Sequence, residues 1–327
     1  MSGTTSGTYS YNQQVVTIVT GSLRLCGAIQ ENETPDASML RDCMDALNAL
    51  IKGWSVAQIH VWCEAECILF LQPLQNQYKL GTGSIDNACL FQDLTQTTLT
   101  ATATMGATVL SVASSTGMLV GDNFGVQLDL GVIYWTTLTA VSTGSVTLAY
   151  GVPSQATSGA ICFDYTTKLV RPLRVPEGRR YLYSTQIETP LIALSRFDYD
   201  YLPNKYNTGT VTQFFYDPQQ GRGAYSTPIG LMNVWPTPSD DTAGVRFVAQ
   251  HAIQDVTSLT NDVDFPVEWL APLRWNLAVE IAPEFDVPGD RFDRLKAKAD
   301  EWFLRVSAWD REPESVFFGY ASQPGYR

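Results

Sequence analysis

Apolar residues recur at helical spacing near both ends of this chain. In residues 12 to 29 one stripe carries Val15, Ile18, Val19, Ser22, Cys26 and Ile29, which predicts an amphipathic helix. A second helix is expected after "TPDA". Thr34 can cap it, Pro35 suits the first helical position, and Asp36 favours the positive end of the helix dipole. Its apolar residues follow a 3-4-3-4-3 spacing that is typical of a helix–helix seam: Ala37, Leu40, Met44, Leu47, Ile51 and Trp54.

The C-terminal part repeats this arrangement. From Leu270, a stripe of Leu273, Leu277 and Ile281 predicts a helix whose end is limited by Pro283 and Pro288. Trp269 and Trp275 are then left for a second surface, either the β region or a neighbouring subunit. A last helix is expected from Asp290, with the seam Phe292, Leu295, Ala299, Trp302, Val306 and Trp309. On its outer side Asp290 can pair with Arg294, and Glu301 with Arg305.

Two terminal pairs of seamed helices predict one discontinuous helical platform with β elements inserted between its halves. The first β element is the extended run "ECILFLQ". Later runs of the same kind are "VTQFFYD", "GLMNVWP" and "GVRFVAQHAI", and a short helix is expected near "LIALSRFDYDYL". The predicted fold class is therefore α+β.

The stretch between Lys79 and Lys168 differs in kind from the rest, because it contains no Lys or Arg. It is rich in threonine, and short apolar/polar alternations recur in it, broken by Gly and Ser about every ten residues. This pattern predicts a small antiparallel β domain at residues 92–167. A domain without basic residues cannot neutralise phosphates, which excludes it as a DNA-binding module. The expected division is residues 1–91, the 92–167 insertion, residues 168–311, and a tail at 312–327.

Charge and composition narrow the function classes. The net charge is −12, so the chain is a poor general nucleic-acid binder, although it could line a channel through which DNA slides. No apolar run reaches the ~18 residues of a membrane helix, so no membrane association is expected. The six sparse cysteines indicate free thiols in a reducing compartment. There is no phosphate-binding loop and no dinucleotide motif, so no cofactor is expected.

The sequence offers little evidence for a catalytic or metal-binding site. His60, Cys63 and Cys67 lie close in sequence, but no fourth zinc ligand is apparent, and His251 is the one other histidine. Two glutamate pairs, Glu64 with Glu66 and Glu280 with Glu284, could serve glycoside hydrolysis. An acidic chain makes such pairs by chance, and a solvated helix face is the simpler interpretation. We therefore predict that the protein is not an enzyme.

Two other groups of residues suggest contacts with partners. An arginine cluster could pair with the acid of a neighbouring subunit or contact DNA in a channel: Arg171, Arg174, Arg179 and Arg180. The tail holds four aromatic residues between prolines and glycines, a pattern typical of an extended docking peptide: Phe317, Phe318, Tyr320 and Tyr326.

An ordered series of sequence patterns resembles a known family. It runs from "SLRLCGAIQENETPDASMLRDCMDALNALIKGWS" and "LQNQYKLG" through "RPLRV", "LSRFDYDYLPNKYNTGTVTQFFYDPQ" and "NVWPTP" to "DVDFPVEWLAPLRWNLAVEIAPEF". The series is similar to the head-to-tail adaptor proteins of short-tailed bacteriophages, also described as tail accessory or packaged-DNA stabilisation proteins. It covers most of the chain except the β insertion and the extreme tail.

The resemblance implies a structural virion protein at the head–tail junction, assembled in the host cytoplasm. Such adaptors form a twelve-subunit ring beneath the portal protein, join it to the tail, extend the DNA channel and help retain packaged DNA. The helical platform would carry the ring contacts, and the C-terminal segment would dock onto the portal. The β insertion is absent from the smallest members, and we expect it on the outside of the ring, near tail fibre or spike proteins. Two alternatives stay open: a tail nozzle or tube subunit, and a virion-associated cell-wall hydrolase.

Overall fold

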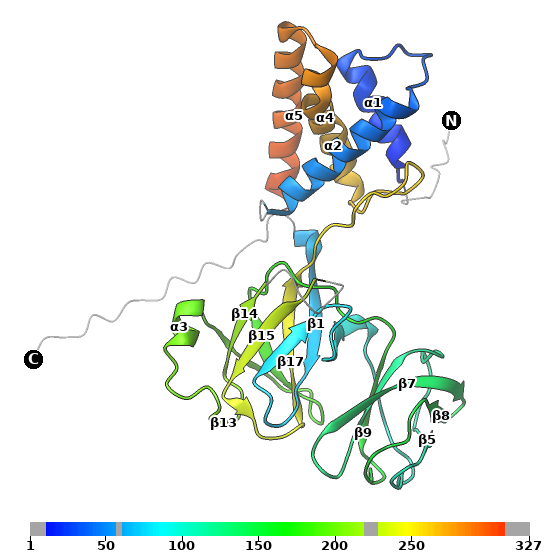
Figure 1. Cartoon of the computed structure of the whole chain (residues 1–327), viewed down its shortest axis with the longest axis vertical. Helices are drawn as coiled ribbons and strands as arrows, with labels where there is room; N and C mark the ends of the chain where they lie inside the picture. Colours follow the sequence, from blue (N-terminus) through cyan, green and yellow to red (C-terminus); the bar gives the residue numbers. More distant parts are fainter. Residues whose placement is uncertain (1–10, 57–60, 219–227, 311–327) are drawn as a thin grey trace, which may run out of the picture. The chain divides into compact units, whose positions relative to one another are not determined.

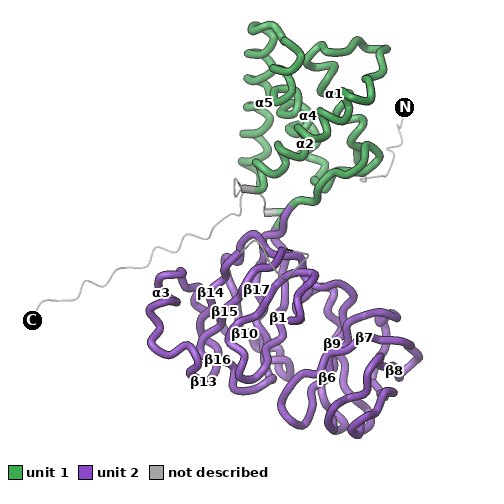
Figure 2. Tube along the Cα trace, viewed as in Figure 1, with its two compact units in different colours: residues 1–63, 253–327 green, residues 64–252 purple. Residues whose placement is uncertain are grey.

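The computed structural model describes residues 11–56, 61–218 and 228–310 of a mixed α+β protein (Figure 1). The chain divides into two compact units: residues 1–63 with 253–327, and residues 64–252 (Figure 2). The segments 64–91 and 168–252 therefore lie in the same unit as the expected β insertion. No helix among the described residues is long and apolar enough to cross a lipid bilayer.

The first unit is helical and is built from both ends of the chain. Its α-helices are α1 (Val15–Cys26), α2 (Ala37–Val56), α4 (Leu270–Ile281) and α5 (Gly289–Trp309), with short 3-10 turns at Val61–Cys63, Val267–Trp269 and Ala282–Phe285. Helix α4 contacts each of the other three helices. The helix positions predicted from the apolar spacing are confirmed.

Local interactions explain where the helices begin and end. Asp36, rather than Thr34, precedes the first turn of α2: its carbonyl accepts from Leu40 N, and its carboxylate accepts from Ala37 N and the Ser38 hydroxyl. The predicted cap is thus wrong by two residues, since Pro35 lies outside the helix. Helix α1 ends at Gly27, whose φ of 81° is left-handed and suits glycine.

One hydrophobic core holds the four helices together. Of the six residues of the first predicted stripe, the five apolar ones are buried in this core, as are Leu270, Leu273, Leu277 and Ile281 of α4. The sixth, Ser22, is also buried and donates to backbone carbonyls of Ile18 and Arg274. The prediction for Trp269 was wrong: its side chain is fully buried among Trp54, Phe265 and Phe303, because it precedes α4 on the side that faces α2 and α5. Trp275 is partly buried against the same core. Trp309 is 63% exposed, so the seam of α5 ends before it.

The two predicted ion pairs on α5 differ in outcome. Arg305 donates to Glu301 at 2.6 Å, as the spacing predicts. Arg294 instead donates through Nε to the backbone carbonyl of Asp290 at 3.0 Å, so the predicted ion pair is replaced by a hydrogen bond to the helix backbone.

The second unit contains a sandwich of two sheets. The five-stranded sheet has the order β11-β10-β17-β1-β3, with β1 Glu64–Phe70, β3 Ala88–Leu90, β10 Gly178–Leu182, β11 Glu188–Pro190 and β17 Ala243–Gln250. The four-stranded sheet has the order β12-β14-β15-β2, with β2 Gln77–Leu80, β12 Ile192–Ala193, β14 Gln213–Asp217 and β15 Gly230–Trp235. Cys67 and Leu69 of the first sheet share a core with Tyr78 and Phe214 of the second.

Two small elements accompany this sandwich. Helix α3 (Arg196–Asp200) follows β12, and β13 (Thr208–Gly209) pairs in parallel with β16 (Thr237–Pro238). The extended runs and the short helix predicted from sequence are confirmed at β1, β14, β15, β17 and α3.

The base-free stretch folds as a six-stranded antiparallel sheet of order β4-β9-β6-β7-β8-β5. Its strands are β4 Thr95–Thr98, β5 Val109–Ser111, β6 Asn123–Gln127, β7 Ile133–Ser142, β8 Ser145–Leu148 and β9 Ile161–Tyr165. A bridge between Leu99 and Val112, with bonds from Thr100 N to Ser111 O and from Ala113 N to Thr98 O, links the first strand to the last. We call this closed sheet the barrel; closure removes the open edges that would otherwise pair with other chains.

Aromatic side chains join the barrel to the five-stranded sheet. The alternation along β1 sends Cys67 and Leu69 into the sandwich core and Ile68 and Phe70 to the opposite face. Phe70 there meets Phe163 at 5.0 Å between ring centroids. The second half of β1, Cys67–Phe70, is thus buried on both faces, which explains why these four residues are all apolar.

Candidate functional site

The arginine cluster divides between the two faces of β10. Arg179 lies directly across from Arg246 of β17, and two glutamates bridge this pair of like charges. Arg179 contacts Glu66 at 3.3 Å and Glu188 at 3.1 Å, and Arg246 pairs with the other oxygen of each carboxylate. The guanidinium of Arg246 also lies 3.8 Å from the centroid of the Phe91 ring.

Arg179 therefore has carboxylate partners within its own chain. Burial lowers the pKa of Arg246, but the hydrogen bonds and charges of Glu66 and Glu188 outweigh it, so the net pKa is raised. Arg246 therefore remains charged. The network joins β1, β10, β11 and β17 on the face of the five-stranded sheet that also carries Ile68 and Phe70.

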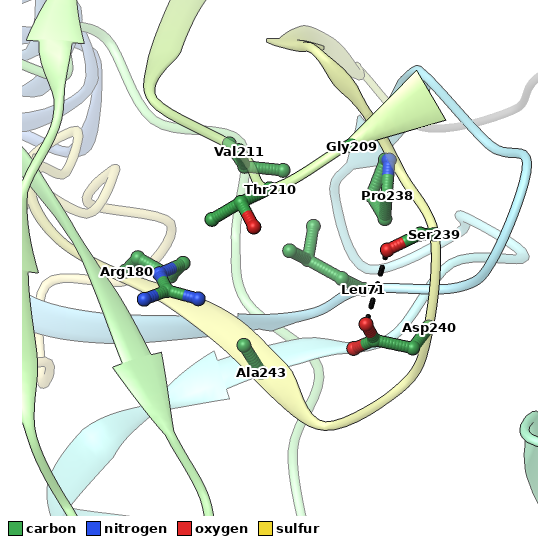
Figure 3. Close-up of a pocket in the computed structure, with 9 residues that line it drawn as sticks. All are labelled: Leu71, Arg180, Gly209, Thr210, Val211, Pro238, Ser239, Asp240 and Ala243. Atoms are coloured by element: carbon green, nitrogen blue, oxygen red, sulfur yellow. Dashed lines mark hydrogen bonds between the residues drawn. The ribbon is translucent and has the colours of Figure 1, made fainter.

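Arg180 points to the other face of the same strand, where it lines a narrow pocket with Thr210, Asp240 and Ala243 (Figure 3). Asp240 lies on the opposite side of this pocket from Arg180 (Figure 3). Hydrogen bonds from Thr242, first its hydroxyl and then its backbone N–H, lower the pKa of Asp240, with smaller contributions from Ser239 and Arg180. The cavity of about 20 Å³ has room for about one water molecule, which is too small for a cofactor.

The other two arginines lie at the surface of the same unit. Arg171 donates to the carbonyl of Pro218 at 3.3 Å, and Arg174 has an exposed side chain and forms a backbone bridge with Gln250. The structure therefore does not gather the four arginines into one patch. The predicted docking residues of the tail, Phe317, Phe318, Tyr320 and Tyr326, lie outside the described residues.

An acidic hollow lies on the helical unit. It is lined by the carboxylates of Asp42, Asp45, Glu280 and Glu284, with Ala46 and Ala49 between them. No ion pair satisfies these four carboxylates within the described part of the chain. Their negative charge also acts on a buried thiol. Burial, and then the charge of Glu284, raises the pKa of Cys43 to about 11.

Sequence reasoning singled out Glu280 and Glu284 as a pair but missed their neighbours on α2. The available signal was the i, i+3 spacing of Asp42 and Asp45 on the polar side of the α2 seam. All four side chains are exposed, so the hollow is an open, solvated surface of acidic groups.

The other candidate residues do not form a site together. Glu66 is tied to Arg179 and Arg246. Cys63 is buried in the helical core and Cys67 in the sandwich core, and all six cysteines are buried thiols that form no disulfide. Over residues 11–56, 61–218 and 228–310, no three His, Cys, Asp or Glu side chains are arranged to hold a metal ion. His60 lies outside the described residues.

Comparison with known proteins adds no relative: no protein-family model matches this sequence, and a search of curated proteins finds no match. The resemblance to phage adaptors therefore rests on the ordered sequence patterns.

Proposed function

We propose that this protein is a head-to-tail adaptor of a short-tailed bacteriophage, a structural subunit that assembles into a ring under the portal. In this proposal the helical unit is the discontinuous platform that carries the ring contacts, and the barrel is a domain inserted into the β unit. The protein would extend the DNA channel, link portal to tail proteins and help to retain packaged DNA, without enzymatic activity.

The observation that carries the proposal is the acidic hollow on a helical unit made from both chain ends. A ring interface is heterologous, so each subunit presents two different complementary faces. Four carboxylates without ion-pair partners among the described residues are suited to one such face, since exposed acid of this density stabilises contact with a basic surface. Arg171 and Arg174, exposed or partly exposed on the β unit, are candidates for the basic counterpart.

The overall charge supports the same proposal. A channel that must pass DNA without holding it should not offer lysine and arginine to the phosphates. A net charge of −12 and the base-free barrel satisfy this condition.

The experiment compares wild type with three variants by electron microscopy and native mass spectrometry, alone and mixed with isolated portal. Wild type should bind portal as a closed ring. The double variant Glu280→Lys, Glu284→Lys should fold but lose ring assembly, whereas the control Asp293→Lys, an exposed acid of α5, should assemble normally. A variant lacking residues 312–327 should keep its fold and lose portal binding.

The outcomes separate the candidate roles. A ring that never binds portal would point to a tail nozzle or tube subunit instead. Portal binding that survives removal of residues 312–327 would refute the assignment of the tail as the docking segment.

A further inference from the structure

A second hollow lies in the β unit, beside the barrel. It measures about 200 Å³ and is lined by residues of β1, of β7 and of the segments that follow β1 and precede β3: Phe70, Gln72, Ile85, Asp86, Asn87 and Trp135. It opens beside Ile85, whose side chain is 74% exposed. None of these residues takes part in the arginine network or the acidic hollow.

The aromatic wall of this hollow is held rigidly. Trp135 of β7 lies opposite Gly125 on the neighbouring strand β6, and a Cβ at position 125 would come within 2.8 Å of the indole ring. Phe70 meets the indole edge to face at 4.7 Å, and Tyr165 does so at 5.6 Å. The ring is therefore fixed on several sides while the side chain stays partly exposed.

The polar groups of the hollow are fixed as well. The Tyr165 hydroxyl donates to Oδ1 of Asn87 at 2.6 Å, which orients the amide so that Nδ2 is directed elsewhere as a donor. Asp86 accepts from Gln75 Nε2 and from Lys79 N, each at 2.7 Å, and its carboxylate oxygens keep further lone pairs. Gln72 uses both ends of its amide on the backbone of Ile133.

We propose that this hollow is a binding site for one sugar ring of a glycan. An aromatic ring offers an apolar face to the C–H groups of a pyranose, and neighbouring hydroxyls would donate to Asp86 and accept from Asn87 Nδ2. The residues that line the hollow include no lysine or arginine, and the carboxylate of Asp86 repels anions, which disfavours phosphate or nucleotide ligands. The volume admits a single ring, so a longer glycan would extend past Ile85 into solvent.

This inference goes beyond the adaptor role and does not depend on ring assembly. A glycan site on the barrel side of the β unit gives the protein an affinity for carbohydrate surfaces, whatever its neighbours in an assembly.

The test uses the full chain and isothermal titration with defined probes: the methyl glycosides of glucose, galactose, mannose and N-acetylglucosamine, and a trisaccharide of each. We expect at least one probe to bind with a Kd of about 1 mM or tighter. Ile85→Arg should weaken this binding by about tenfold or more, because the longer side chain covers the opening. The matched control Ile192→Arg, at a 61% exposed position of β12, should bind as the wild type does.

Two measurements keep the result interpretable. Circular dichroism of each variant checks that the fold is intact, and Asn87→Ala gives a second loss of affinity without touching the rim. The proposal is overturned if no glycoside binds, if Ile85→Arg binds as tightly as wild type, or if Ile192→Arg loses binding equally. Binding of N-acetyltyrosine amide in place of every glycoside would also overturn it, since the hollow would then be a peptide site.

Discussion

Replacing Asp164 by asparagine should remove a pH dependence that is built into the barrel. Asp164 is 2% exposed and Asp122 is 1% exposed, and the two carboxyl groups are hydrogen-bonded neighbours. Asp122 also accepts from the backbone N–H of Leu119 at 2.6 Å. Burial, and then the charge and hydrogen bond of Asp122, raise the pKa of Asp164 from 3.8 to about 7.

The sign and size follow from this shift. Because the folded state holds the proton more tightly than the unfolded chain, the stabilisation is full below pH 4 and is lost as pH rises through about 7. About 1.4 kcal/mol per pKa unit sets a ceiling of about 4 kcal/mol, and relaxation of the site with entry of water reduces this to about 1–3 kcal/mol. In the Asp164→Asn variant the new amide would stay neutral and donate to Asp122 at every pH.

The assay is urea unfolding at pH 5.5, 7.0 and 8.5, with hydrogen exchange of the peptide covering residues 119–128 as a local probe. Wild type should lose about 1–3 kcal/mol of stability across this range, and Asp164→Asn should lose much less. Asp129→Asn is the control, because this carboxyl is exposed and hydrogen bonds from Thr157 lower its pKa still further below the tested range. The reasoning would be refuted if wild type and Asp164→Asn showed the same pH dependence.

Three further substitutions test the packing. Gly125→Ala should destabilise the barrel by about 1–3 kcal/mol, because the new methyl group collides with Trp135, and a lowered Tm would show it. Arg246→Met should cost about 2 kcal/mol in urea unfolding, since two glutamates lose a partner. The partly exposed Lys298→Met should cost less than about 0.5 kcal/mol. Leu277→Ala should cost about 3 kcal/mol by the same measurement, because its side chain is fully buried among the helices; a cost below about 1 kcal/mol would contradict the assigned core.

The local spacing of apolar residues was sufficient to predict the positions of the helices and of most strands. The stripes of α1 and α4 lie on consecutive turns, so their spacing in sequence equals their grouping in space. The same holds for the alternation in the barrel strands. The α+β class was therefore available from the sequence.

Two of the wrong predictions have different causes. Trp269 is buried because Trp54 and Phe303, from two helices distant in sequence, pack against it. The cap of α2 is a local error, because Asp36, and not Thr34, is the residue that precedes the first helical turn. For the candidate site, the pair of Glu280 and Glu284 could be predicted from the sequence. That Asp42 and Asp45 lie beside this pair follows only from the packing of α4 on α2.

What the sequence determined by itself is thus the periodic part of the molecule: which segments are helices or strands and which face of each is apolar. The tertiary structure decided the closure of the barrel at Leu99 and Val112, the carboxyl pair of Asp122 and Asp164, and the hollow beside Trp135. Each of these brings together residues from separate strands or loops. Periodicity reports burial along one element, whereas contacts between elements depend on strand order and register, which are set by the free energy of the whole fold.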